Sequence, residues 1–283
     1  MIDKKKIFLI VGLGLIGGSY ARGLKKQGYT VYAIDQNQQS LDYALQEKII
    51  DAGAVWEPDL LAQAEYVIFA LYPLTMVEWI KQYQSYLKPG AMITDTSGVK
   101  CHIVDAVQEN LRADLEFIGS HPMAGKEVSG VQYSDENIFL PANYIVTPTD
   151  KNTKKGILFA IELAQILQFY HIAILSPQRH DEMIGFVSQL THAIAVSLMN
   201  CNDTPNLEEY TGDSFRDLTR IAKINEKMWS ELFLLNKENL VREIDDFAGA
   251  LQDLKEKLIQ EDVPGLQDLF KESTERRARF DKK

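Results

Sequence analysis

Three glycines near the amino terminus have the spacing of a phosphate-binding turn. They belong to the run Gly12-Leu13-Gly14-Leu15-Ile16-Gly17. The first glycine allows a tight turn, the second lets a pyrophosphate approach the backbone, and the third lets a helix pack closely on the preceding strand. The amino end of that helix offers N–H groups and a positive dipole end to phosphates. The run predicts a dinucleotide site, lined also by Leu15 and Ile16. The alternative is a glycine-rich turn without a ligand.

An acidic residue follows the turn at the distance expected of a ribose contact. Asp35 ends the apolar run 30–34, 18 residues after Gly17. A carboxylate at this place accepts hydrogen bonds from the adenosine ribose hydroxyls and repels the 2′-phosphate of NADP. Residues 36–38 include no arginine that could hold such a phosphate. The sequence therefore favours NAD over NADP as the cofactor.

The five histidines are candidates for a general base, because a histidine pKa lies near neutrality. Oxidation of an alcohol by a nicotinamide needs such a base for the hydroxyl proton. His121 is favoured, since it follows a predicted strand at the edge where the nicotinamide would lie, although a surface loop histidine is the alternative. His192 lies in a very apolar segment and is either a core histidine or a substrate contact. We expect His171 to be structural, and His102 and His180 to be solvated.

Strands and helices that must position these residues alternate over the first 175 residues. Strands are predicted at 7–11, 30–34, 66–71, 92–94, 117–119, 144–147 and 171–175, and helices at 17–27, 40–47, 76–86 and 153–167. Wholly apolar runs are typical of strands buried on both faces of a parallel sheet. The pattern predicts an α/β fold with a Rossmann-type, doubly wound, mostly parallel sheet. Two stretches at its carboxyl edge are candidates for the cofactor wall: Leu71-Tyr72-Pro73, and residues 94–97, which end in Ser97. The alternative is that these residues only position the loops in which they lie.

No convincing strand follows residue 176, so an all-helical C-terminal domain is predicted. The nearly all-apolar segment 181–200 is expected to be a buried central helix, and 227–260 one long amphipathic helix. The latter would be roughly 50 Å long, which favours a subunit interface over an internal bundle. The predicted division is therefore an NAD-binding domain, 1–175, and a helical substrate-binding and dimerisation domain, 176–283.

Composition narrows the possible partners. The formal net charge is −10, which argues against nucleic acid, because such binding needs a basic surface. No run of eighteen apolar residues is present, so no membrane span is predicted. The basic start followed by residues 7–18 imitates a signal peptide, but the same segment is needed as the first strand. Cys101 and Cys201 form neither a disulfide framework nor a metal cluster, and two unpaired thiols indicate the cytoplasm.

Four separated motifs resemble the prephenate dehydrogenase family. Residues 120–127, Ser-His-Pro-Met-Ala-Gly-Lys-Glu, resemble the family signature H-P-[IM]-A-G-x-E. Residues 215–222, Phe-Arg-Asp-Leu-Thr-Arg-Ile-Ala, resemble its F-x-D-x-T-R-I-A segment, and Met228-Trp229 its M-W pair. With the glycine turn, the resemblance extends in the right order over about 250 residues.

The resemblance implies roles for the matching residues. His121 corresponds to the catalytic histidine, which accepts a hydrogen bond from the ring hydroxyl of prephenate. Arg220 corresponds to an arginine that binds a substrate carboxylate, for which the planar guanidinium is well suited. His192 corresponds to a second histidine that contacts the substrate. No metal site is implied.

Further positions of the resemblance are expected to surround the substrate. Gly125 and Glu127 belong to the same motif as the catalytic histidine. Asp181 resembles an acidic residue near the mouth of the cleft, where it would pair with Arg220. The family often has a serine directly before a Val-Lys pair, whereas Ser97 lies one residue earlier. Ser97 is nevertheless expected to be a catalytic residue and to contact the cofactor.

The activity implied is NAD-dependent oxidative decarboxylation of prephenate, a small anion, to 4-hydroxyphenylpyruvate in tyrosine biosynthesis, by a cytoplasmic homodimer. Arogenate dehydrogenase is the nearest alternative, and the sequence offers no discriminator. A β-hydroxyacid dehydrogenase would need a G-x-x-x-K pattern on the interdomain helix, but Gln189 follows Gly185 at that spacing. An NAD-binding sensor without turnover would give no reason for His121 and Arg220 together.

Overall fold

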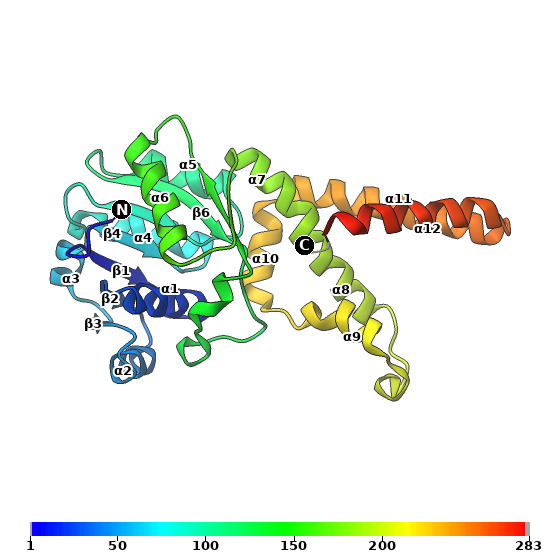
Figure 1. Ribbon diagram of the computed structural model, residues 1–283, viewed down its shortest axis with the longest axis horizontal. Helices are drawn as coiled ribbons and strands as arrows, with labels where there is room; N and C mark the ends of the chain where they lie inside the picture. The colour runs from blue at the N-terminus through cyan, green and yellow to red at the C-terminus, as the bar shows by residue number, and fades with distance from the viewer. Residues whose placement is uncertain (1, 281–283) are drawn as a thin grey trace. The chain divides into compact units, whose positions relative to one another are not determined.

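The computed structural model describes residues 2–280. Its backbone divides into two compact units, Met1–Asn236 and Lys237–Lys283. The domain boundary predicted at residue 175 stays a prediction, because the compact units are a different division of the chain. Each unit has its own arrangement of elements (Figure 1).

In the described residues, the first unit contains an eight-stranded sheet in the order β3-β2-β1-β4-β5-β6-β7-β8. Its strands are β1 (Ile7–Val11), β2 (Thr30–Ile34), β3 (Ala52–Ala54), β4 (Tyr66–Phe69), β5 (Met92–Asp95), β6 (Glu116–Pro122), β7 (Asn143–Thr147) and β8 (His171–Ile174). Neighbouring strands are parallel except for β6 and β7. The strand order turns back at β1, between β2 and β4, which is where doubly wound sheets bind ligands. The predicted fold class is confirmed.

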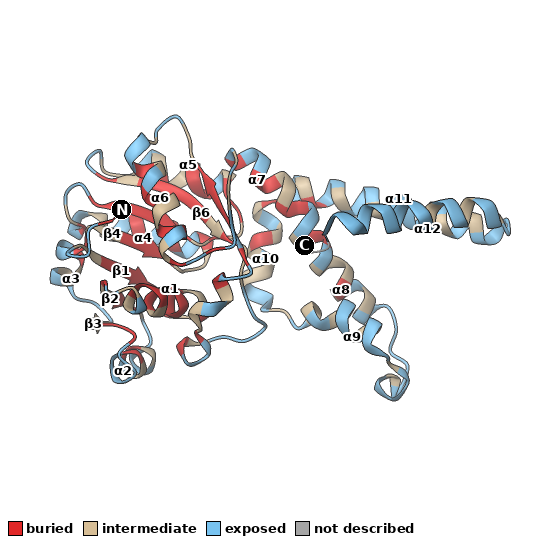
Figure 2. Ribbon diagram, in the orientation of Figure 1, coloured by how far each residue is buried: buried red, intermediate tan, exposed pale blue. Residues whose placement is uncertain are grey.

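Both faces of this sheet are covered by helices. They are α1 (Leu15–Lys26), α2 (Gln38–Gln46), α3 (Pro58–Gln63), α4 (Pro73–Tyr83), α5 (Cys101–Asn110) and α6 (Lys154–Ile166). Phe8 and Ile10 of β1 pack in one buried cluster with α1 and α6, whereas Leu9 and Val11 pack in another with α4 and α5. This alternation places the two clusters on opposite faces of the sheet. Buried residues accordingly concentrate in the strands and on the inner sides of these helices (Figure 2).

Strand β6 extends further than predicted, because its second half pairs with an antiparallel neighbour. Gly119 is opposite Thr147, and His121 is opposite Ile145. His121 therefore lies inside a paired strand rather than in the loop that follows it. The short strand β3 was not predicted, since its Ala-Gly-Ala sequence lacks large apolar side chains.

The rest of the first unit is helical, and one helix runs without interruption from Pro177 to Asn200. It comprises α7 (Pro177–Ile184), a π-helical segment (Gly185–Leu190) and α8 (Thr191–Asn200), and is followed by α9 (Asp213–Thr219) and α10 (Glu226–Leu235). The prediction that 181–200 is a buried central helix is wrong for the single chain, since Phe186 is 56% and Val187 50% exposed. The length and composition of this helix alone would allow it to cross a membrane, but one such helix is weak evidence for a membrane span.

The single long helix predicted over 227–260 is also wrong. It is divided at Asn236 into α10 and α11 (Lys237–Ile259); the second unit consists of α11, α12 (Val263–Arg277) and a short final turn. The amide of Asn236 is buried and donates to the backbone oxygen of Asp181 at 2.9 Å and to Oε1 of Gln189 at 2.7 Å. These hydrogen bonds lie within the first unit and hold the chain at Asn236, between the two helices. The apolar pattern of the sequence continues across this position, which is why it predicted one helix.

Candidate active site

The glycine turn lies between β1 and α1. It is tightly packed at Gly12 and Gly17 and open at Gly14. Gly12 has a φ of +99°, and a Cβ there would lie 2.5 Å from the backbone oxygen of Ala70. A Cβ at Gly17 would overlap the backbone oxygen of Gly12, whereas a Cβ at Gly14 would meet nothing within 4 Å. Gly14 is the N-cap of α1 and provides no side chain to cap it, and the first turn of α1, which begins at Leu15 and Ile16, holds no acidic residue. This open helix end suits a pyrophosphate.

Asp35 stands at the end of β2, directly against this turn. Its Oδ2 accepts from the backbone N–H of Leu13 at 2.5 Å, and its Oδ1 from that of Asn37 at 2.7 Å. A carboxylate offers about four acceptor positions, so two remain for ribose hydroxyls. The turn and the carboxylate together fit a dinucleotide whose ribose carries no 2′-phosphate.

The predicted cofactor wall after β4 is held in place by helices. Leu71 is partly buried beside Gly12, and Pro73 is buried at the start of α4. The hydroxyl of Tyr72 accepts from Nδ2 of Asn225 at 3.0 Å, and Asn225 also caps α10. The wall therefore connects the carboxyl edge of the sheet with the helical segment that follows Arg220.

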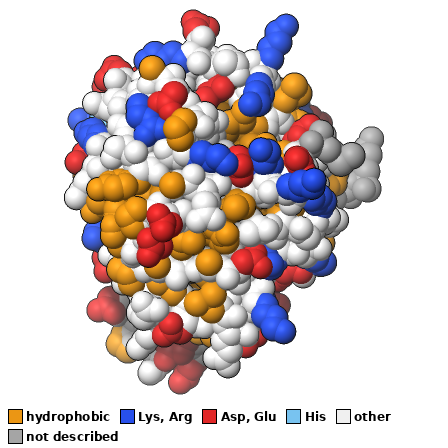
Figure 3. All heavy atoms as spheres, turned by 90° about the vertical axis from the view of Figure 1, so that its left-hand side faces the viewer, with side chains coloured by type: hydrophobic (Ala, Val, Ile, Leu, Met, Phe, Trp, Pro, Cys, Tyr) orange, Lys and Arg blue, Asp and Glu red, His pale blue; other side chains and the backbone are white. Residues whose placement is uncertain are grey.

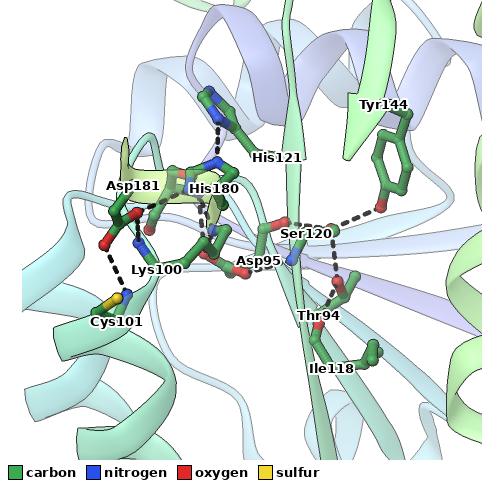
Figure 4. Close-up of polar contacts among 11 residues, drawn as sticks. Thr94, Asp95, Lys100, Cys101, Ile118, Ser120, His121, Tyr144, His180 and Asp181 are labelled. Atoms are coloured by element: carbon green, nitrogen blue, oxygen red, sulfur yellow. Dashed lines mark hydrogen bonds and ion pairs between the residues drawn. The ribbon is translucent and has the colours of Figure 1, made fainter. Parts of the chain in front are cut away.

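The most buried polar part of the site links β6 with α7. Nδ1 of His121 lies 2.9 Å from Nε2 of His180, and Nδ1 of His180 lies 2.7 Å from Oδ1 of Asp181 (Figure 4). His180 is fully buried and Asp181 is 2% exposed. Asp181 also accepts from the backbone N–H groups of Lys100 and Cys101, at 2.8 Å each. It is thus enclosed at the start of α5.

This geometry corrects two predictions. His180 is not solvated, because its ring lies between two polar partners in the interior. Asp181 does not pair with Arg220 at the mouth of a cleft, because both of its oxygens are already bonded to His180 and α5. The guanidinium of Arg220 instead forms an ion pair with Glu127.

Burial controls the protonation of this group. It lowers the pKa of His121 well below the ordinary value, and the nearby His180 and Lys100 lower it further. Burial also lowers the pKa of His180, which the hydrogen bond to Asp181 opposes. For Asp181, burial raises the pKa, but hydrogen bonds from His180 and from α5 bring it below the ordinary value. The lowered pKa values therefore favour neutral rings for His121 and His180 and an ionised Asp181.

A buried ion pair joins Asp95, at the end of β5, to Lys100 near His121. Nζ of Lys100 lies 2.6 Å from Oδ2 of Asp95, and neither side chain is exposed. Oδ1 of Asp95 accepts from the backbone N–H of Ser120 at 3.0 Å, and the Ser120 hydroxyl accepts from Tyr144 at 2.6 Å (Figure 4). The residue before His121 is therefore held from two sides, by Asp95, which lies in the predicted cofactor wall, and by Tyr144, which sequence reasoning had not selected.

Ser97 is buried in the same loop, but its hydroxyl has no hydrogen-bond partner within the described residues. Its backbone N–H donates to Asp95 at 2.9 Å, and its carbonyl accepts from Nζ of Lys100 at 2.8 Å. Ser97 does not bond to His121 in this arrangement. Its roles toward substrate and cofactor stay predictions.

The remaining predicted substrate residues lie closer to the surface. The side chain of Arg220 is 63% exposed and that of Glu127 33%. His192 stacks on Trp229 with ring centroids 3.7 Å apart, and its Nδ1 donates to the backbone oxygen of Ser188 at 2.9 Å. A Cβ on Gly125 would meet nothing within 4 Å, so the loop is open there. These positions offer a guanidinium and a ring nitrogen to an anionic ligand.

Other features of the surface lie apart from this group. A cavity of about 420 Å³ at the amino ends of β5 and β6 is lined by Arg112, Glu116 and Lys151 among others, but by none of the predicted site residues. Among residues 2–280, no group of three His, Cys, Asp or Glu could hold a metal ion. On the face shown in Figure 3, basic side chains are interspersed with acidic ones instead of forming one basic surface.

Known proteins share both the sequence and the architecture. The family model of the prephenate dehydrogenase nucleotide-binding domain matches residues 20–168, and that of its dimerization domain matches 176–272. Prephenate dehydrogenase of Bacillus subtilis is 31% identical over 96% of this chain and 75% of the relative. Cyclohexadienyl dehydrogenase of Zymomonas mobilis is 28% identical, over 96% and 95%.

A solved structure agrees along nearly the whole chain. Prephenate dehydrogenase from Aquifex aeolicus, in complex with hydroxyphenyl propionate and NAD+, is 33% identical with a TM-score of 0.91. The match covers 99% of this chain and 100% of that one. The resemblance predicted from the four motifs is therefore confirmed: this chain belongs to the prephenate dehydrogenase family.

Proposed function

We propose that the chain catalyses the NAD-dependent oxidative decarboxylation of prephenate to 4-hydroxyphenylpyruvate, as a cytoplasmic enzyme of tyrosine biosynthesis. The observation that carries this proposal is His121, a partly buried histidine whose pKa is lowered by its surroundings, at the carboxyl edge of the sheet that also holds the glycine turn and Asp35. The solved structure described above is in complex with NAD+ and hydroxyphenyl propionate, which supports the same pairing of cofactor and ring.

The residues present can carry out the proton transfers of this reaction. Bound NAD would accept the hydride from the ring carbon that bears the hydroxyl. Nε2 of His121 takes the hydroxyl proton as that carbon becomes a carbonyl. The bond to the ring carboxylate then breaks, CO2 leaves, and its electron pair makes the ring aromatic. The ring oxygen regains a proton, which the protonated His121 can return.

The assay that tests the proposal is NADH formation with prephenate, repeated with arogenate and with NADP in place of NAD. We expect turnover with prephenate and NAD, and much less with NADP because Asp35 faces the ribose position. The alternative substrate, arogenate, is favoured by the relative named cyclohexadienyl dehydrogenase. Absence of turnover with both cyclohexadienyl substrates would contradict the proposal and leave NAD binding without chemistry.

Replacing Arg220 by glutamine should raise KM for prephenate roughly ten- to a hundredfold. A charge-assisted hydrogen bond contributes about 1.5–3 kcal/mol, and the loss falls on substrate binding, so kcat should change less. The substrate carboxylate would bind the guanidinium that now pairs with Glu127. The matched control is Arg179→Gln, since Arg179 is exposed and forms its ion pair with Glu182 on the surface. An unchanged KM in Arg220→Gln would refute the carboxylate role.

Replacing Gly14 by alanine should weaken NAD binding without destabilising the protein. The added methyl meets no protein atom, but it occupies the face on which the pyrophosphate would lie. Crowding of this size costs about 1–3 kcal/mol, so KM for NAD should rise roughly five- to a hundredfold. Gly249→Ala is the control, because its Cβ also meets nothing within 4 Å. The pyrophosphate assignment fails if both variants show the wild-type KM.

We infer that the enzyme acts as a homodimer through its helical part. Residues 176–272 match a dimerization domain, and α11 has a row of apolar side chains that are 40–58% exposed in the single chain: Val241, Ile244, Leu251 and Leu258. Light scattering after size-exclusion chromatography should give twice the mass of the chain, and a monomeric mass at assay concentration would refute the inference.

A further inference from the structure

We propose that His180 and Asp181 are positioning residues that hold the hydrogen of His121 on Nδ1 and leave Nε2 free to take the substrate proton. The inference rests on the proposed function, in which His121 is the base. It concerns residues of α7 that no sequence motif marked as catalytic.

The hydrogen-bond directions follow from the carboxylate. An ionised Asp181 can only accept, so the contact of 2.7 Å requires a hydrogen on Nδ1 of His180. A neutral His180 then has a lone pair on Nε2, which must accept across the 2.9 Å contact with His121. The donor there is Nδ1 of His121, and its Nε2 keeps a lone pair. While both rings are neutral, no other assignment satisfies the two contacts.

The free nitrogen of His121 lies near Gly98. A Cβ built on Gly98 would lie 3.8 Å from Nε2 of His121 and 3.5 Å from the nearest atom of Leu232. Because residue 98 is a glycine, its side chain does not occupy this space. Nε2 lies across the ring from the nitrogen that contacts His180, so a substrate hydroxyl would approach it from the side opposite His180.

Asp181 is held from more than one direction. Its two oxygens accept from the backbone N–H groups at the start of α5, where the helix dipole also favours a negative charge. Its own carbonyl accepts from Asn236 at 2.9 Å, and Asn236 donates also to Gln189 at 2.7 Å. The orientation of the carboxylate is thus decided before any ligand binds.

The charged and titratable groups around the histidines support this arrangement. Lys100 lies near them directly before α5, but its ammonium is paired with Asp95 of β5 at 2.6 Å. Burial, with Asp181 next, raises the pKa of the Cys101 thiol to about 12, so this neighbour stays neutral. Asp181 is then the ionised carboxylate that fixes the ring hydrogen of His180 and, through it, that of His121, as the aspartate of a Ser-His-Asp triad fixes its histidine.

The direct test is the position of the ring hydrogens. Nitrogen-15 NMR of the full-length protein with labelled histidines identifies which nitrogen of each ring carries hydrogen, and the spectra of His121→Asn and His180→Gln assign the signals. We expect hydrogen on Nδ1 in both rings of the wild type. In Asp181→Asn, whose amide can also donate, His180 should lose this preference. A wild-type His121 with its hydrogen on Nε2 overturns the proposal, whatever the activity.

Kinetics give the second test. Asp181→Asn and His180→Gln should each lower kcat on the order of 10²–10⁴-fold, the usual contribution of general-base catalysis, with little change in KM for NAD. In His180→Gln the acid limb of the pH profile should move to higher pH, because His180 no longer lowers the pKa of His121. A purely structural role would not move this limb. His102→Gln, an exposed histidine of α5, is the matched control and should behave as wild type.

The outcomes separate the inference from the function on which it rests. Wild-type kcat in Asp181→Asn and His180→Gln, with His121→Asn inactive, would refute the role of the pair and leave the base in place. Wild-type kcat in His121→Asn would refute the base itself. Thermal unfolding and NAD binding show which variants fold; if Asp181→Asn does not fold, His180→Gln and the wild-type NMR spectrum decide.

Discussion

His121→Asn is expected to reduce kcat by roughly 10²–10⁴-fold while NAD binding is retained. The asparagine can fill much of the space of the ring, but it cannot accept a proton near neutral pH. The glycine turn and Asp35 lie on β1, α1 and β2, so the cofactor site should remain intact. Steady-state kinetics with prephenate, together with NAD titration by calorimetry, measure both effects on the same preparation.

The pH dependence of the wild type belongs to the same prediction. His121 must be neutral to accept the proton, so kcat/KM should fall as the pH decreases through its pKa. Burial, with His180 and Lys100, lowers that pKa from 6.5, and the acid limb should therefore lie below pH 6.5. In His121→Asn this limb should disappear from the residual activity. A wild-type kcat in His121→Asn would refute the assignment of His121 as the general base.

Lys100→Met should destabilise the protein by about 3–5 kcal/mol, the usual cost of removing one partner of a buried ion pair. Methionine fills the volume of the lysine stem but leaves Asp95 as a buried carboxylate without its cation. Because Asp95 also holds the backbone of Ser120, His121 would lose part of its support and kcat should fall as well. Urea unfolding at one fixed protein concentration gives the free energy of unfolding, since association contributes to it.

The control for this variant is Lys81→Met on α4. Lys81 pairs with Glu78 at 2.9 Å, but the two side chains are 43% and 72% exposed. An exposed pair contributes about 0–1 kcal/mol, so little change is expected. If Lys100→Met costs no more than Lys81→Met, the ion pair does not stabilise the site as described.

Features with local signals were predictable from the sequence. The glycine turn, Asp35 and most strands are encoded by residues close together in the chain. The departures have non-local causes. β6 is longer because β7 pairs with its second half, and α10 ends because the Asn236 amide is bonded to Asp181 and Gln189. Neither interaction leaves a trace in the apolar pattern of the segment it alters.

The same distinction applies to the site. His121 and Arg220 were found because they lie in recognisable motifs. His180 lies 59 residues from His121 in sequence, and its polar neighbours are typical of a solvated helix start. Only the folded chain shows that the His180-Asp181 dipeptide is enclosed by α5 and β6. An adjacent histidine and aspartate after a Ser-Pro helix start is the one signal that could have suggested it.

The antiparallel pairing of β6 with β7 has a consequence for how the gene can change. Side chains of a strand alternate between the two faces of a sheet, so a one-residue shift would turn His121 away from His180. A single-codon deletion within 119–122 or 144–147 should therefore abolish the reaction even if the sheet still forms. The connecting segment 123–142 has no such parity constraint. Natural or engineered length variation in this region should thus be confined to the part of the connection that follows Glu127, while the two paired segments keep a constant length.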